Sequence, residues 1–364
     1  MARRVSIKDV AQRAGVSWKT VSNVVNERPV VRPDTRATVL AAIEELGYVP
    51  NHVGRELRGG PTRTIALVVP ELQNPYFARL AERMQAAARE RGYTVSVEVS
   101  LHSAETERAH VRGRTARPVD AVVISPSALD PADLLDRASG PPVVLLGETL
   151  SGAAGVVHVA IDNVASAADV VRHLVAGGHR RLLFLGAEDA VRSTGTDRLA
   201  GFRAATRFAE LPQDPTLVRG VGEWTREAGR DAVLGALEDA AEFDAVVAGN
   251  DLLAVGALAA LHARGLDVPG DVAVVGWDDT AEVAWTRPAL TSIAPDLDAL
   301  IAAALDAAIA GAEQSGTEQA GAERADTEQA GAEQNGTGTA GRVAEAVIAH
   351  RLVERESTRA VPSA

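Results

Sequence analysis

The sequence contains no cysteine, which excludes a disulfide framework and a thiolate site. Aromatic residues make up 3% of the chain, and Lys8 and Lys19 are the two lysines among many arginines. No apolar run approaches the roughly 20 residues that a membrane-spanning helix needs. No signal peptide follows Met1 either. We therefore expect a cytoplasmic protein with no membrane partner.

Motifs of the common enzyme classes are also missing. The chain has no Walker loop, no Gly-x-Ser-x-Gly elbow and no HExxH metal pair. Its eight histidines are scattered without ligand spacing, and the stretch Gly220 to Gly222 lacks the third glycine of a dinucleotide fingerprint. We expect no enzymatic activity, no cofactor and no metal.

Charge is distributed unevenly along the 364 residues, which suffice for two or three domains. The net charge is −12, yet residues 1–60 carry ten Lys and Arg against six Asp and Glu. The remaining residues carry 27 basic against 43 acidic side chains. A basic front on an acidic body would direct the front toward phosphates and keep the body away from them.

The basic front contains the pattern of a helix-turn-helix. Apolar residues recur at helical spacing from Ile7 to Ala14, and Ser6 with Asp9 forms a capping-box start. Gly15 then allows a sharp turn with positive φ. Ser17 begins a second helix whose inward face is Val21, Val24 and Val25. Such a unit places its second helix in the DNA major groove.

The outward face of the second helix carries Trp18, Lys19, Ser22 and Asn23. Asn can pair two atoms of adenine, and Lys can donate to guanine. The alternative is an ordinary solvated helix face. A third helix is predicted from Pro33 to Gly47, with Leu40, Ile43 and Leu46 facing the first two helices.

A short segment from Asn51 to Arg58 follows the predicted three-helix domain. It is too short for a stable isolated helix, and Gly54 in its middle costs about 1 kcal/mol relative to Ala. We expect it to become helical against a partner, with Leu57 as a wedge into a minor groove between Arg55 and Arg58. The alternative is a plain linker.

From Thr64 onward, apolar strands alternate with helices as far as Val275, which predicts parallel sheets with helices on both faces. There are enough units for two doubly wound lobes. Their ligand is expected beyond the carboxyl ends of the strands, in the cleft between the lobes. Residues 311–341 differ, because they repeat Thr-Glu-Gln-Ala-Gly-Ala-Glu without a large apolar residue. We predict a disordered insertion there, between a helix at 296–310 and a last strand at 344–353.

Taken together, these motifs resemble the lactose-repressor/galactose-repressor (LacI/GalR) family of bacterial transcription factors, from Ser6 to about Ser357. The most specific match is the run from Ile7 to Asn26, and motifs in the body agree. These motifs lie at 46–51, 74–77, 162–163, 177–181, 198–202, 249–251, 276–279 and 352–357.

The resemblance implies a helix-turn-helix head with a hinge helix, followed by a periplasmic-binding-protein-like α/β body of two lobes. It sets the head at 1–50, hinge and linker at 51–61, the N-terminal lobe at 62–161 with 291–310, and the C-terminal lobe at 162–290 with 342–357. It also implies a homodimer on a roughly palindromic operator, acting as a repressor. The predicted DNA-binding residues are Ser6, Lys8, Ser17, Trp18, Lys19, Thr20, Ser22, Asn23, Asn26, Asn51, Arg55, Leu57 and Arg58.

The resemblance further places a small-molecule effector in the cleft, either a sugar or derivative or, as the alternative, a nucleobase or nucleoside. Paired donors and acceptors with aromatic walls suit sugar hydroxyls and sugar faces. The predicted effector-binding residues are Tyr76, Phe77, Glu148, Asp162, Arg198, Trp224, Asn250, Asp251 and Asp278.

Each of these residues also has a structural interpretation. Asp162 and Asp251 would then cap helices, Tyr76 and Phe77 would belong to the core, and Arg198 would pair with Asp278 as a structural ion pair. A rival class is an exported solute-binding protein, which the basic front and the missing export signal disfavour. Two departures from the family pattern are Gly54, where Ala is usual, and Arg32, where a small capping residue is usual.

Overall fold

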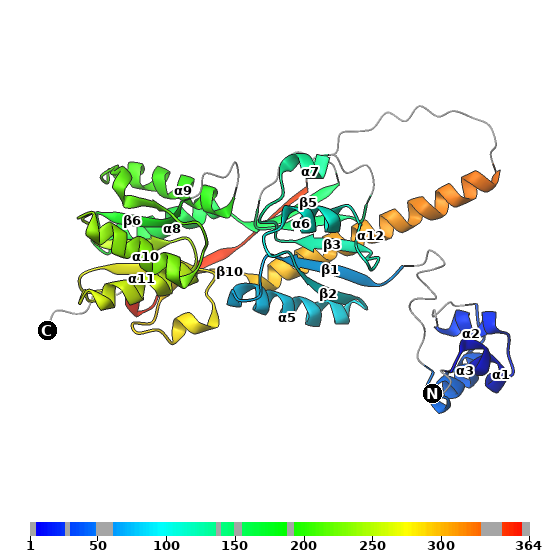
Figure 1. Cartoon of the computed structure of the whole chain (residues 1–364). Helices are drawn as coiled ribbons and strands as arrows, with labels where there is room; N and C mark the ends of the chain where they lie inside the picture. Colours follow the sequence, from blue (N-terminus) through cyan, green and yellow to red (C-terminus); the bar gives the residue numbers. More distant parts are fainter. Residues whose placement is uncertain are drawn as a thin grey trace. The chain divides into compact units, whose positions relative to one another are not determined.

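The structure is a computed structural model that describes residues 5–25, 30–48, 61–135, 140–148, 155–187, 193–328 and 344–358, with the backbone alone for 318–328 and 344. The chain divides into two compact units, Met1–Thr62 and Arg63–Ala364, which we call the head and the body. Figure 1 colours both along the sequence. The predicted hinge at 51–58 lies outside the described residues.

The head has the predicted helix-turn-helix. Ser6 caps the first helix with a complete capping box, in which its backbone N–H donates to the Asp9 carboxylate at 2.8 Å. Gly15 adopts the left-handed conformation, with φ of 66°, that the turn requires. The helices are α1 (Ile7–Ala14), α2 (Trp18–Val25) and α3 (Pro33–Glu45).

The core of the head corrects one prediction for α3. Val39 and Ala42 are buried, and Ile43 and Leu46 pack against the same core, whereas Leu40 is 51% exposed. The buried positions follow helical spacing, and Leu40 lies about 100° around the helix from Val39, off this stripe. Leu40 was therefore wrongly assigned to the core.

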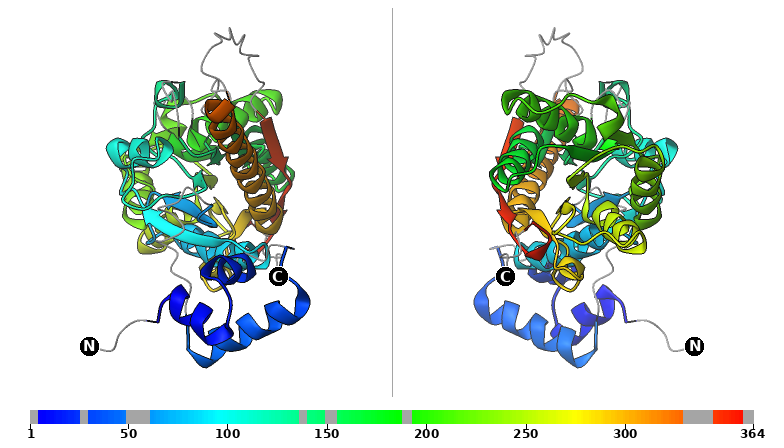
Figure 2. Two further views of the ribbon diagram at one scale, coloured as in Figure 1. Left: turned by 90° about the vertical axis from the view of Figure 1, so that its right-hand side faces the viewer. Right: turned by 90° about the vertical axis from the view of Figure 1, so that its left-hand side faces the viewer.

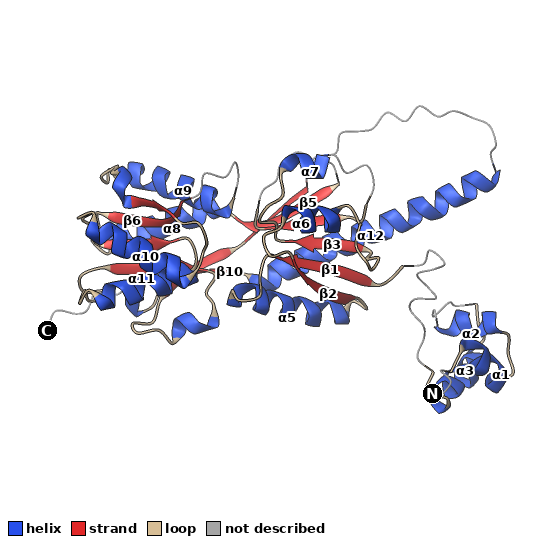
Figure 3. Ribbon diagram, viewed as in Figure 1, coloured by secondary structure: helices blue, strands red, loops and turns tan. Residues whose placement is uncertain are grey.

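The body consists of two lobes, each built on a six-stranded sheet with helices on both faces (Figure 3). The N-lobe sheet has the strand order β11-β5-β4-β3-β1-β2 and the C-lobe sheet the order β12-β10-β9-β8-β6-β7. All neighbours are parallel except β10 and β12. The N-lobe strands are β1 (Thr64–Val69), β2 (Thr94–Val99), β3 (Ala121–Ile124), β4 (Val143–Leu146), β5 (Val156–Ile161) and β11 (Ala344–Ile348). The C-lobe strands are β6 (Leu182–Ala187), β7 (Val218–Gly220), β8 (Ala245–Ala248), β9 (Ala273–Trp277), β10 (Thr291–Pro295) and β12 (His350–Val353).

Alternation along the strands creates a core on each face of each sheet. In β1, Ile65 and Leu67 face the core under α5 and α12, while Ala66 and Val68 face the opposite core. The end-on views of Figure 2 show α12 covering its face of the N-lobe. The helices of the N-lobe are α5 (Pro75–Glu90), α6 (Ala104–Val111), α7 (Pro131–Leu135) and α12 (Leu297–Glu328). The C-lobe has α8 (Asn163–Ala176), α9 (Thr194–Phe208), α10 (Arg226–Glu238) and α11 (Asp251–Ala263), with short 3₁₀ turns at 215–217, 281–284 and 356–358.

The chain crosses between the lobes after β5, after β10 and between β11 and β12. This corrects two predicted boundaries. Residues 291–295 belong to the C-lobe sheet, and the predicted strand 344–353 is two strands, of which β11 belongs to the N-lobe. The sequence did not reveal this, because an apolar strand pattern does not indicate which of the two sheets a strand joins.

Helix α12 corrects the predicted disorder of residues 311–341 as far as residue 328. The helix continues without interruption from Leu297 to Glu328. Ala, Glu and Gln are strong helix formers, and extending an existing helix avoids the cost of nucleation. The absence of large apolar residues therefore excluded a core but not a helix. Residues 329–341 lie outside the described part.

Within the described ranges, no helix combines the length and the apolar character required to cross a bilayer.

Candidate functional site

The second helix of the head presents polar side chains outward over a buried base. Val21 and Val24 are buried, whereas Trp18 is 48% exposed and Lys19 is exposed. Ser22 and Asn23 are partly exposed on the same helix. One face of α2 is therefore exposed to solvent, as predicted, and its contact with bases stays a prediction.

Three of the other predicted DNA-binding residues have local structural roles. Ser6 caps α1, and the Ser17 hydroxyl accepts the Thr20 amide at 3.1 Å and lies 2.8 Å from the Thr20 hydroxyl. These contacts fix the starts of α1 and α2 and do not preclude contact with phosphates. Lys8 is exposed on α1. Asn26, Asn51, Arg55, Leu57 and Arg58 lie outside the described residues.

In the body, Arg198 on α9 is the centre of the candidate effector site. It is only 7% exposed, and its Nε donates to Asn163 Oδ1 at 2.9 Å. Its Nη1 donates to the carbonyl of Gly249, at the end of β8. These two bonds fix the plane of the guanidinium group, and the remaining N–H groups of its fork can face a ligand.

Two indole rings flank this guanidinium group. The Cζ atom of Arg198 lies 5.8 Å from the Trp224 ring centroid and 5.1 Å from that of Trp277. Both distances are within the range of cation–π attraction. Burial lowers the pKa of Arg198, and the charges of Asp278 and Glu148 oppose that effect. The Nε1 atoms of both tryptophans are buried without a hydrogen-bond partner among the described residues.

Asp278 is the acidic group whose charge most strongly opposes the lowering of the Arg198 pKa. It follows β9 in a left-handed conformation with φ of 99°, and its backbone N–H donates to the Ile293 carbonyl at 2.9 Å. Burial raises the pKa of Asp278 to about 6, and the positive charge of Arg198 limits the rise. The group therefore changes its charge near neutral pH.

The N-lobe contributes Tyr76 and Phe77 from the first turn of α5, which Asn74 caps. Their rings meet edge to face with centroids 5.3 Å apart, and both pack against the N-lobe core. Burial raises the pKa of Tyr76, the nearby Asp278 raises it further, and Arg198 lowers it. Tyr76 is thus close enough to Asp278 and Arg198 for both charges to act on it, and its ring packs against Phe77.

Glu148 lies just after β4 and contacts the opposite lobe. Its carboxylate accepts the backbone N–H of Thr194 at 2.7 Å and the Thr194 hydroxyl at 3.0 Å, at the start of α9. An acidic group at a helix N-terminus is favourable because of the unpaired amides there. Glu148 therefore bridges the lobes near Arg198.

The capping role considered for Asp162 and Asp251 belongs in the structure to Asp162 and Asn250. Asp162 caps α8 by accepting the Ala165 amide at 2.8 Å, and Asn250 caps α11 by accepting the Leu253 amide at 2.9 Å. The Asn250 amide group also donates to the Trp224 carbonyl at 3.4 Å. In contrast, Asn163 and Trp277 contact Arg198, and the sequence prediction missed both.

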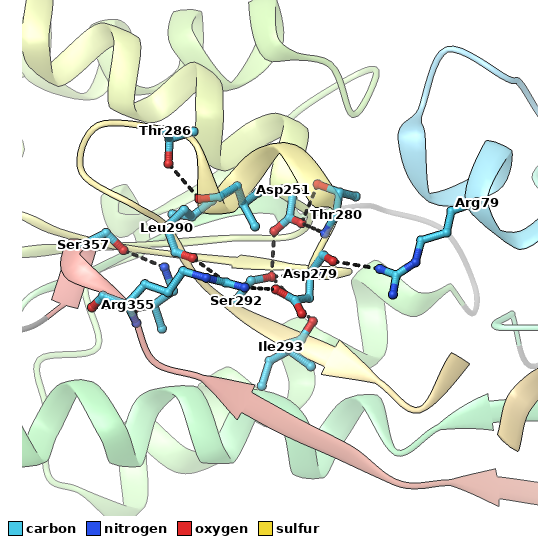
Figure 4. A network of polar contacts seen from close by, with 12 residues as sticks. Arg79, Asp251, Asp279, Thr280, Thr286, Leu290, Ser292, Ile293, Arg355 and Ser357 are labelled. Carbon is cyan, nitrogen blue, oxygen red and sulfur yellow. Dashed lines mark hydrogen bonds and ion pairs between the residues drawn. The ribbon is translucent and has the colours of Figure 1, made fainter. Parts of the chain in front are cut away.

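Asp251 belongs to a polar network in the C-lobe (Figure 4). Its carboxylate accepts the Thr280 amide at 2.7 Å, the Thr280 hydroxyl at 3.0 Å and the Ser292 hydroxyl at 2.7 Å. Burial raises the pKa of Asp251, as does the charge of Asp278. Because both oxygens are occupied, Asp251 supports the turn that follows β9 and does not face a ligand directly.

The chemistry available is recognition by hydrogen bonds and ring contacts. No group of three or more metal-ligating side chains occurs in the part of the chain that the structure describes. A cavity of about 180 Å³ lies elsewhere in the C-lobe, between α9 and residues 211–218, and none of the predicted effector residues lines it.

The fold and the site define a class of protein: a small helix-turn-helix domain joined to a two-lobed ligand-binding body. Family comparisons agree. Residues 6–51 match the model of bacterial regulatory proteins of the lacI family, and residues 171–358 match the periplasmic binding protein-like domain.

Individual relatives extend the match to most of the chain. The transcriptional regulator AscG of Escherichia coli (strain K12) is 36% identical over 291 residues, which cover 78% of this chain and 85% of AscG. A lac repressor dimer bound to operator and the anti-inducer ONPF superimposes with a TM-score of 0.78, 25% identity and coverage of 98% and 100%. A complex of the regulator CelR with cellobiose gives a TM-score of 0.62, 31% identity and coverage of 97% and 100%. The chain belongs to the lacI family and is a DNA-binding transcriptional regulator, which confirms the predicted resemblance.

Proposed function

We propose that this regulator binds a small sugar or sugar derivative between its two lobes, at Arg198 and Asp278, and that the ligand controls operator affinity. The buried Arg198, near the rings of Trp224 and Trp277 and within the influence of the Asp278 charge, is the observation that supports this most directly. Adjacent donors and acceptors suit neighbouring sugar hydroxyls, and indole or phenol rings suit the apolar faces of a sugar.

The relatives support a carbohydrate effector, since CelR was solved with cellobiose. A nucleobase or nucleoside is the alternative, because Tyr76 and Trp224 would also stack on a planar base. The two ligand classes differ in the group that would donate a hydrogen bond to Asp278. A sugar donates to it from hydroxyl groups, whereas a base would donate from a ring or exocyclic nitrogen.

A thermal-shift screen of the full chain with cellobiose, glucose, galactose, hypoxanthine and adenosine tests the effector class. We expect a sugar to raise the unfolding temperature, because ligand binding to the native state stabilises it. Arg198→Met should remove the shift, and Arg203→Met on the exposed face of α9 should retain it. A shift from the purine compounds alone, or an equal shift in Arg198→Met, would contradict the proposal.

We propose further that two chains form a homodimer whose α2 helices contact a roughly palindromic operator in the cytoplasm, without catalysis. The supporting observation is the exposed face of α2 on a basic head. Light scattering should give twice the 37.9 kDa mass of one chain. A gel shift with duplexes selected from a random pool should show salt-sensitive binding by the full chain and none by residues 61–364.

The proposed mechanism links these two activities. Ligand binding changes the arrangement of the lobes, which changes the spacing of the paired hinge segments. This in turn changes the affinity of the heads for the operator. Coupling of this kind is typically about 1–3 kcal/mol. We propose that the protein is a repressor released by its ligand. An increase in operator affinity on adding the sugar found by thermal shift would contradict release.

A further inference from the structure

Arg79 reaches from the N-lobe into the C-lobe beside the proposed effector site. It lies one helical turn after Tyr76 on α5, and its Nη1 donates to the backbone carbonyl of Asp279 at 3.0 Å (Figure 4). Asp279 directly follows Asp278. Helix α5 therefore places the ring of Tyr76 near Asp278 and the guanidinium group of Arg79 on Asp279, the next residue of the loop after β9.

The turn that accepts Arg79 is unusual in its backbone. Asp278 and Asp279 both have positive φ, at 99° and 47°, which is unfavourable for residues with a side chain. Such a conformation persists when its surroundings hold it in place. Here the direction of the Asp279 carbonyl, the group that Arg79 contacts, depends on that conformation.

The C-lobe fixes Asp279 at its other polar groups. The Asp279 amide donates to the Ser292 hydroxyl at 3.1 Å, and Arg355 Nη2 donates to the Asp279 carboxylate at 2.6 Å. Arg355 is itself held by the Leu290 carbonyl at 2.8 Å. The Asp279 carbonyl that accepts from Arg79 is thus held in place by the C-lobe. Whether this hydrogen bond forms therefore depends on the position of α5 in the N-lobe.

A second contact between the lobes gives an independent reporter of closure. The Thr194 amide of the C-lobe donates to Glu148 of the N-lobe, from a different element than α5. Two residues on, the Thr196 amide donates to the Ser193 hydroxyl within the same lobe, at 3.0 Å. Separation of the lobes would free the first amide and leave the second protected.

We infer that Arg79 is a positioning residue that biases the body toward the closed arrangement of its lobes and, through Asp279, sets the turn that presents Asp278 to the ligand. The part that concerns the ligand rests on the proposed function. The part that concerns closure does not, because both contacts exist within the protein alone.

Amide hydrogen exchange of the full-length protein without any sugar tests this inference. Arg79→Gln removes the charged fork from an exposed position, so the fold should be retained. We expect exchange at Thr194 to rise about three- to tenfold, as loss of one such hydrogen bond allows, because exchange follows local opening. Exchange at Thr196 should not change.

Arg83→Gln is the matched control. Arg83 lies one turn further along α5, and its Nη1 pairs with Asp298 of the same lobe at 3.0 Å. Arg83→Gln should leave amide exchange at Thr194 unchanged. Glu148→Ala should raise this exchange, which validates the Thr194 amide as a reporter of lobe separation. The inference is overturned if Arg79→Gln leaves amide exchange at Thr194 unchanged, or if it raises exchange at Thr194 and Thr196 together. It is also overturned if Arg83→Gln raises exchange at Thr194 as much as Arg79→Gln does. A failed sugar screen would not affect this result, so failure of the two proposals can be told apart.

Discussion

The head and the body present their candidate binding residues in opposite ways. In the head, Trp18 and Lys19 extend outward from a small core and meet solvent. In the body, Arg198 is buried and already bonded to Asn163 and Gly249. Exposed contacts act nearly independently, whereas groups in one buried network depend on each other. Single substitutions in the body should therefore have larger effects than those in the head.

Charge separates the same two regions. The basic excess of residues 1–60 lies on a chain whose remainder is strongly acidic. Attraction to phosphates decreases as salt is added, whereas a buried site is screened much less. Salt should thus weaken DNA binding by the head far more than ligand binding by the body.

The largest effect should come from Arg198→Met. We expect the affinity for the sugar found in the screen to fall by at least about 100-fold, because a buried charged donor is lost and Asp278 loses a nearby positive charge. Isothermal titration measures it, with Arg203→Met as the control on the same helix. Binding within threefold of the parent protein would show that the buried network is not the site.

In the head, Asn23→Ala should weaken binding to the selected duplex by about tenfold, as expected for one lost base contact. It should relax the preference at one base position only. Lys8→Ala should instead weaken all duplexes alike and lower the salt slope by about one. A loss of preference spread over every position would mean that Asn23 supports the fold of α2 and does not contact a base.

Ligand binding by the body should also depend on pH, through Asp278. The Asp278 carboxyl, with its pKa near 6, is mostly charged at pH 7 and mostly neutral at pH 5. Affinity for a ligand that donates to this carboxylate should fall about tenfold between these values. Because the folded-state pKa lies above the ordinary 3.8, this group should also make folding stability decrease as the pH rises from about 4 through 6. Asp278→Asn should abolish both effects, and an unchanged pH profile in that variant would assign them elsewhere.

The smallest effect concerns the connection between the regions. Gly54 lies in the predicted hinge, outside the described residues. Replacement by Ala should favour a helix by about 1 kcal/mol and tighten operator binding about fivefold. A gel shift of Gly54→Ala against the parent protein measures this. Weaker binding would show that the segment does not bind DNA as a helix.

Some candidate residues could be predicted and others could not, for identifiable reasons. Arg198 and Asp278 were recognised from short motifs, and the structure brings them together. Asp162 was chosen in place of its neighbour Asn163, although Asp162 caps α8 and Asn163 bonds to Arg198. Adjacent polar residues at a helix start are alike in sequence, and only the direction of each side chain distinguishes them.

The contacts of Trp277 and Glu148 also could not be predicted from the local sequence, because their partners lie further away in the chain. Trp277 ends an apolar strand and looks like a core residue, and its contact with Arg198 depends on α9 and β9 contributing to the same core. Glu148 was predicted to contact the ligand, yet it accepts two hydrogen bonds from Thr194 of the opposite lobe. Nothing in the local sequence encodes a partner 46 residues away.

The sequence by itself determined the caps and the turn of the head, the alternation of strands and helices, and the contrast of charge between head and body. These follow from neighbouring residues, through helical spacing, backbone preference and composition. The tertiary structure alone decided which lobe holds β10 and β11, how far α12 continues, and which polar groups meet Arg198 and Asp279. Those outcomes depend on which surfaces come together when the two sheets are formed, and that is a property of distant residues acting jointly.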